Sequence, residues 1–146
     1  MTEKDSKIAA LIENCHGQDL DAHYLGFFEC FNRGLYFEAH EVLEQLWLPH
    51  RHGPKHAFYQ GLIQLAGAFV HLKKTRLRPS ASLFKLAQSN LQKYPAIYEH
   101  LDVAAVLRLI ETWQSQLETQ QFSVNPLTSA SAPELHLLPR DNHNRP

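Results

Sequence analysis

The 146 residues are the length of one ordinary domain, long enough to bury a core without disulfide bonds. The 14 Lys and Arg residues nearly balance the 15 Asp and Glu residues, which argues against the basic surface of a nucleic-acid-binding protein. Two cysteines are too few for a disulfide framework, and no apolar run reaches the roughly 18 residues of a membrane span. Because the start of the chain also lacks a signal-peptide pattern, we expect a cytoplasmic protein.

Apolar residues recur at helical spacing along most of the sequence. Strand signals are nearly absent, since there is no sustained alternation and no Asn-Gly or Asp-Gly hairpin turn. In chain order, the predicted helices cover about residues 4–15, a segment from a cap at Asp19 or Asp21 to Gly34, residues 36–48, 55–74 and 79–94, and a segment from a cap at Asp102 to Glu118.

These segments predict an all-α protein that forms a single compact irregular bundle of five or six helices. Residues 1–120 are expected to form this helical domain. After Gln120 the composition changes to Ser, Pro, Asn and isolated apolar residues. We therefore predict that residues 121–146 are an irregular C-terminal tail without a core of its own, at most draped over the bundle.

The third predicted helix carries four titratable residues within FNRGLYFEAHEVLEQLW, residues 31–47. On a helical wheel His40 and Glu44 fall at the border of the apolar face, four residues apart, so they can contact each other. Glu38 and Glu41 fall further round, toward solvent. The helix therefore has one pair of polar residues that is expected to face a neighbouring helix.

The fourth predicted helix has a complementary polar stripe made by Gln60, Gln64, Gly67 and His71. Buried polar groups must find partners, because an unpaired one costs roughly 1–3 kcal/mol. If the two helices form an antiparallel hairpin, the partners of this stripe are expected to be His40 and Glu44. The sequence thus predicts a polar cluster between helices three and four, with these candidate ligand-binding residues: His40, Glu44, Gln60, Gln64 and His71.

HEVLE, residues 40–44, has the spacing of the zinc-peptidase HExxH helix, with Glu44 in place of the second ligand histidine. His40, Glu44 and His71 could therefore hold a divalent metal such as zinc, with Glu41 as a candidate general base. Two alternatives stay open, namely a hydrogen-bonded structural network and a small-ligand pocket without metal. Whether the protein is an enzyme is not decided by this pattern.

Two further segments have ligand-like composition. The loop HRHGPKH holds His50, His52 and His56 at spacing compatible with a metal, although such a loop is usually solvated. KKTRLR, residues 73–78, places four positive charges at the end of the fourth helix, where cations are favoured. An anion or RNA patch is the alternative for these cations, and the neutral charge balance counts against RNA.

Two linked motifs resemble the domain-of-unknown-function family numbered 309. FNRGLYFEAHEVLEQLW and the later FYQGLIQLAGAFVHLKK follow the pattern of this family, whose members are small all-helical proteins of bacteria and plastids. The match spans about residues 20–95. The resemblance implies a compact irregular helical bundle, and it implies no activity because the function of the family is not established.

Two hypotheses for the function follow. In the first, the protein is a binding module that holds a small ligand or a metal in the polar cluster. In the second, it is a structural or protein-interaction module in which the cluster only fixes helix packing, and a protein partner or a second copy binds elsewhere. A pocket that reaches the cluster favours the first hypothesis, and a sealed, hydrogen-bonded cluster favours the second.

Overall fold

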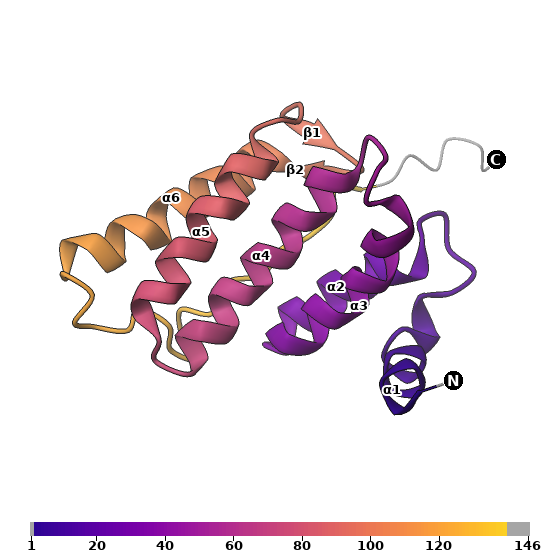
Figure 1. Cartoon of the computed structure of the whole chain (residues 1–146), viewed down its shortest axis with the longest axis horizontal. Helices are drawn as coiled ribbons and strands as arrows, with labels where there is room; N and C mark the ends of the chain where they lie inside the picture. Colours follow the sequence, from indigo (N-terminus) through magenta and orange to yellow (C-terminus); the bar gives the residue numbers. More distant parts are fainter. Residues whose placement is uncertain (1, 140–146) are drawn as a thin grey trace.

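The computed structural model describes residues 2–139, and within this range α-helices dominate the chain (Figure 1). The elements are α1 (Glu3–Leu11), the short 3-10 helix η1 (Glu13–Cys15), α2 (Ala22–Asn32), α3 (Tyr36–His50), α4 (His56–Lys73), α5 (Leu77–Leu91), β1 (Ile97–Tyr98), β2 (Leu101–Asp102) and α6 (Val103–Thr119). The prediction of an all-α bundle is confirmed.

Several helix ends form where the sequence predicts them. The Asp21 carboxylate accepts a hydrogen bond from the backbone N–H of His23 and caps α2. Gly34 follows α2 with a φ of +75°, the left-handed conformation that a helix terminator requires. The Asp102 carboxylate likewise accepts from Ala105 N at 2.9 Å and caps α6.

The end of α3 differs from the prediction, because the helix runs through Pro49 to His50 instead of stopping before Pro49. A proline lacks the N–H that would bond to the carbonyl of Gln45, but its fixed φ is compatible with a helix. Since α3 ends one residue later, only one hydrogen bond of the last turn is lost. The penalty for an internal proline is therefore small at this position.

A two-residue hairpin, not predicted from the sequence, joins α5 to α6. Its central residues Glu99 and His100 have φ values of 50° and 59°, as a type I′ turn requires. Three contacts hold this turn: Tyr24 Oη donates to the Glu99 carbonyl at 2.7 Å, Lys55 Nζ lies 2.8 Å from the Glu99 carboxylate, and Leu138 N donates to the His100 carbonyl at 2.7 Å. Tertiary contacts thus replace the glycine that such turns usually contain.

Helix α4 lies between α3 and α5 and carries the centre of the core (Figure 1). The fully buried ring of Phe69 contacts rings from four other helices, at centroid distances of 5.5 Å to Phe31, 5.1 Å to Tyr36, 5.4 Å to Phe84 and 4.9 Å to Trp113. The pairs with Phe31, Phe84 and Trp113 are edge-to-face and the pair with Tyr36 is stacked. Aromatic pairs of both kinds stabilise the packing beyond the burial of their area. For all its apolar surface, α4 is no membrane span: among residues 2–139 no helix combines the length and the apolar character that crossing a membrane demands.

After Thr119 the described chain consists of turns and irregular backbone, and it contacts the bundle. Leu135 is buried, and the Asn32 side chain bonds to both its backbone N–H and its carbonyl, at 2.6 and 2.8 Å. Asn125 donates to the Leu72 carbonyl at 2.6 Å. The irregular segment therefore lies across the helices and adds one buried leucine to their core.

Candidate functional site

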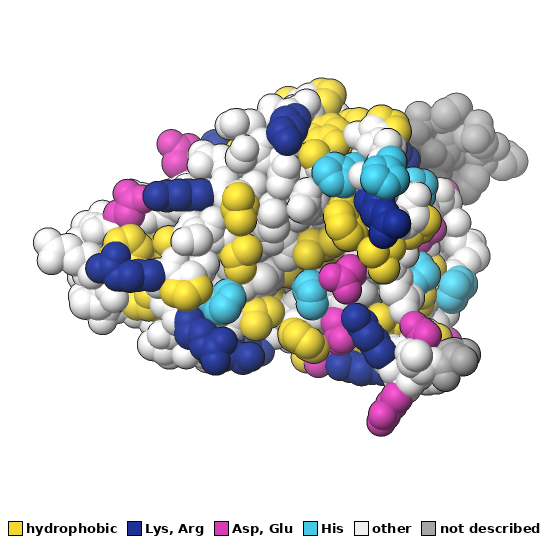
Figure 2. Space-filling model, in the orientation of Figure 1, with side chains coloured by type: hydrophobic (Ala, Val, Ile, Leu, Met, Phe, Trp, Pro, Cys, Tyr) yellow, Lys and Arg dark blue, Asp and Glu magenta, His cyan; other side chains and the backbone are white. Residues whose placement is uncertain are grey.

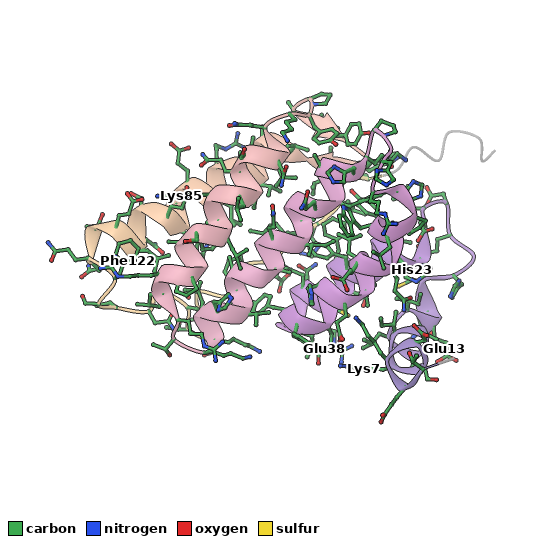
Figure 3. All side chains as sticks on the ribbon, viewed as in Figure 1. Lys7, Glu13, His23, Glu38, Lys85 and Phe122 are labelled. Atoms are coloured by element: carbon green, nitrogen blue, oxygen red, sulfur yellow. The ribbon has the colours of Figure 1, made fainter. Side chains whose placement is uncertain are left out.

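Glu41, the candidate general base, is a buried carboxylate rather than a solvent-facing one. Its residue is 7% exposed, and Lys7 Nζ of α1 lies 3.1 Å from Oε1 while Lys4 Nζ lies 3.9 Å from Oε2. The expectation that Glu41 faces solvent is wrong, because α1 packs against this side of α3 (Figure 3). A helical wheel of α3 alone cannot show that another helix packs on the face that carries Glu41.

His40 and Glu44 contact each other, as their spacing predicts. His40 Nε2 lies 3.8 Å from Glu44 Oε2, and His40 Nδ1 lies 3.2 Å from the Phe37 carbonyl. Lys4 Nζ also lies 3.4 Å from Glu44 Oε1, so this ammonium group bridges Glu41 and Glu44. The titratable groups of the HEVLE segment thus form one continuous set of polar contacts with two lysines of α1.

Gln45, which is not among the predicted site residues, extends this network. Its side-chain N–H donates to Asp5 Oδ1 at 2.9 Å, and its carbonyl oxygen lies 3.1 Å from His23 Nε2. Backbone and side-chain hydrogen bonds from Thr2 are the main causes that lower the pKa of Asp5. Gln45 therefore links α1, α2 and α3 through their polar faces.

The polar stripe of α4 turns toward α5 at its centre. Gln64 Oε1 accepts a hydrogen bond from Asn90 Nδ2 at 2.7 Å, so the expectation that Gln64 bonds to His40 or Glu44 is wrong. A Cβ on Gly61 would lie 2.8 Å from Leu91 Cγ, which means that a glycine is needed for α5 to approach this closely. Gln60 is half-buried, and its side chain has no hydrogen bond within residues 2–139.

His71 lies half-buried in the last turn of α4. Its Nδ1 atom is buried and has no hydrogen-bond partner in the part of the chain that the structure describes. Burial lowers the pKa of the imidazole, and the charges of Arg76 and Lys74 lower it further. The ring is therefore neutral at pH 7, the form in which histidine binds a metal.

The structure brings His40 together with Glu44 but does not gather the five predicted ligand residues into one hydrogen-bonded cluster. Within residues 2–139, no group of three or more His, Cys, Asp or Glu side chains is arranged to hold a metal ion. The predicted set of His40, Glu44 and His71, and the histidines of the loop at residues 50–56, thus remain predictions.

Among the surface hollows of the described residues, two are lined in part by the tail and by the end of α2. One of about 610 Å³ is enclosed by α1, η1, α2 and the tail, and it is lined by Cys15, Phe28 and Leu135 among others. The other, of about 470 Å³, lies between the α2–α3 turn, the end of α4 and the tail. Neither is lined by any of the five predicted ligand residues.

This geometry defines a small all-helical domain built around the acidic helix α3 and the apolar helix α4. The family model described as "Domain of unknown function (DUF309)" matches residues 24–83. This match confirms the resemblance inferred from the two motifs. The matched segment contains most of α2, all of α3 and α4 and the first part of α5, while α1, α6 and the tail lie outside it. Neither the curated proteins nor the solved structures gave a match.

Proposed function

We propose that this protein is a structural or protein-interaction module in which the acidic motif of α3 fixes the packing of its helices. The observation that carries the proposal is the ion pair between Lys7 and Glu41, whose carboxylate is almost fully buried. Both carboxylates of the HEVLE segment, Glu41 and Glu44, already face an ammonium group of α1. A substrate or metal that used Glu41 would have to displace part of α1.

The charges between α1 and α3 also support a structural role. Glu41 and Glu44 are matched by Lys4 and Lys7, and Gln45 adds neutral hydrogen bonds to the same three helices. The pair of Lys4 with Glu44 is largely exposed, so it contributes at most about 1 kcal/mol. Glu41 is the important member, because removal of its partner leaves a buried charge without compensation.

A double-mutant cycle on Lys7→Gln and Glu41→Gln, followed by urea unfolding, tests the proposal. We expect Glu41→Gln to lower the free energy of unfolding by about 1–3 kcal/mol, and the two changes to be non-additive by at least about 0.5 kcal/mol. Glu38→Gln is the matched control, since Glu38 lies on the same helix without an ion pair in the described chain, and it should change stability by less than about 0.5 kcal/mol. Additive effects no larger than those of the control would contradict the proposal.

Small-ligand or metal binding by His40, Glu44 and His71, supported by Gln60 or Gln64, is the second candidate. Two observations favour it: His40 and Glu44 already lie 3.8 Å apart, and His71 offers a neutral imidazole with an unpartnered nitrogen. Zinc accepts both nitrogen and carboxylate ligands. Such a site would require side chains to move together on binding.

Calorimetric titration with zinc at pH 7.5 and 5.5 separates the two candidates. A site at these residues predicts binding that is lost in His40→Ala and in His71→Ala and that weakens below about pH 6, because the imidazoles must be neutral. A variant with His50, His52 and His56 changed to Ala is the control for the exposed loop. Zinc binding that survives both single variants and disappears in this control would assign the metal to the loop and contradict the second candidate.

A further inference from the structure

The hollow of about 470 Å³ beside the α2–α3 turn has the composition of an anion site. It is bounded by Arg33 and Gly34 after α2, by Tyr36 at the start of α3, by Lys73 at the end of α4 and by a tail segment at residues 125–132. Its lining contains two cationic side chains and no Asp or Glu. Figure 2 shows Lys and Arg side chains gathered at the end of α4 where this hollow begins.

Neither cation of the hollow is neutralised by a carboxylate. Within residues 2–139, Arg33 and Lys73 take part in no ion pair. Lys73 Nζ donates one hydrogen bond to the Gly34 carbonyl at 2.7 Å and lies 5.4 Å from the centroid of the Tyr36 ring. This holds the ammonium group at the mouth of the hollow and leaves its other two N–H groups available to a ligand.

The N-terminus of α3 opens at the same place. The first backbone N–H groups of a helix have no partner within the helix, and the N-cap residue Leu35 supplies no side-chain acceptor. Such an end carries a partial positive charge and binds anions readily. Glu38 belongs to this first turn but does not line the hollow.

Tyr36 supplies an independent observation that points to a ligand. The residue is 2% exposed and lines the hollow, and its hydroxyl is buried without a hydrogen-bond partner in the described chain. A buried hydroxyl without a partner is unfavourable and rare in native proteins. The hydroxyl is closed to solvent as the structure stands, so a ligand oxygen would have to open the wall beside Tyr36 to provide the missing acceptor.

We propose that this hollow binds a small organic anion, a carboxylate or phosphate monoester attached to a short apolar body. Arg33, Lys73 and the first turn of α3 would contact the anionic oxygens, with the Tyr36 hydroxyl as a further donor. Leu127 lines the same hollow and would contact the apolar body. The volume is that of pockets which enclose small metabolites.

Calorimetric titrations of the full chain with benzoate, phenyl phosphate, inorganic phosphate and benzamide test the charge requirement. We expect benzoate or phenyl phosphate to bind and neutral benzamide, which has nearly the shape of benzoate, to bind at least about tenfold more weakly. The tighter of the two anions identifies the ligand as a carboxylate or a phosphate ester. Equal affinity for benzoate and benzamide, or binding of none of the four probes, would overturn the proposal.

Variants locate the bound anion. Lys73→Gln and Arg33→Gln should each weaken binding at least about tenfold, whereas Lys74→Gln, which removes the neighbouring charge outside the lining, should change it less than about twofold. Equal losses from Lys73→Gln and Lys74→Gln would show attraction to net charge alone and overturn the site.

The Tyr36 hydroxyl has a test of its own. Tyr36→Phe should weaken binding several-fold while leaving the thermal midpoint unchanged or higher, because the hydroxyl has no partner in the unliganded protein. Ser80→Ala is the matched control, since it also removes a buried hydroxyl without a partner but does not touch the hollow. Unchanged affinity in Tyr36→Phe, as in this control, would remove Tyr36 from the proposed site.

Discussion

At the scale of single residues, His71 is an ionisable group whose surroundings favour its neutral form. Its Nδ1 atom is buried without a partner, and burial together with Arg76 and Lys74 lowers the pKa of the ring. In the unfolded chain the same imidazole titrates near its ordinary pKa of about 6.5. The unfolded state therefore binds a proton at a higher pH than the native state does.

This difference predicts that His71 reduces stability in mild acid. Below about pH 6.5 the unfolded state gains a proton that the native state does not accept, so the free energy of unfolding falls with pH until the lowered native pKa is reached. Urea unfolding of wild type and His71→Leu at pH 7.5 and 5.5, with a chelator present, measures this loss of stability. The loss of stability between the two pH values should be smaller in His71→Leu, while the control His136→Leu, at an exposed position, should behave as wild type. Equal losses in wild type and His71→Leu would contradict the lowered pKa.

At the scale of elements, the helix boundaries follow from local chemistry and could be predicted. Asp21, Gly34 and Asp102 act through their own backbone and nearest neighbours, which the sequence contains. The hairpin at Glu99 and His100 could not be predicted, because its left-handed residues are held by Tyr24, Lys55 and the tail, far away in the chain. Local signals determine where helices end, whereas distant contacts determine such exceptions.

The candidate site shows the same division between local and distant information. The contact between His40 and Glu44 depends only on the period of one helix and was predicted correctly. The burial of Glu41 depends on α1, and the partner of Gln64 depends on which neighbour of α4 faces the stripe. Neither choice is encoded in the pattern of a single helix, so the predicted cluster appears in the structure as separate pairs.

At the scale of the whole molecule, α1 and the tail pack on the segment that matches the family model, residues 24–83. Helix α1 places Lys4 and Lys7 on the acidic face of α3, and the tail lies across the ends of α2 and α4. Each proposal involves one of these two segments. The lysines of α1 neutralise Glu41 and Glu44, and the tail completes the hollow beside Tyr36. The parts of the chain outside residues 24–83 therefore decide which surfaces of the domain remain accessible.

We expect the tail to unfold together with the bundle rather than as a separate strap, because the Asn32 side chain bonds twice to the backbone of buried Leu135. Asn32→Ala removes both bonds and should lower the free energy of unfolding by about 1–3 kcal/mol. Hydrogen exchange of the Leu135 and Leu138 amides should speed up in this variant more than exchange within α4, since local opening of the tail becomes easier. Val124→Ala is the control, because Val124 is half exposed on the same tail and should change stability by less than about 0.5 kcal/mol. Wild-type exchange of these two amides at the rate of an unprotected chain would show that the tail does not belong to the cooperative unit, and the hollow it completes would then lack one of its walls.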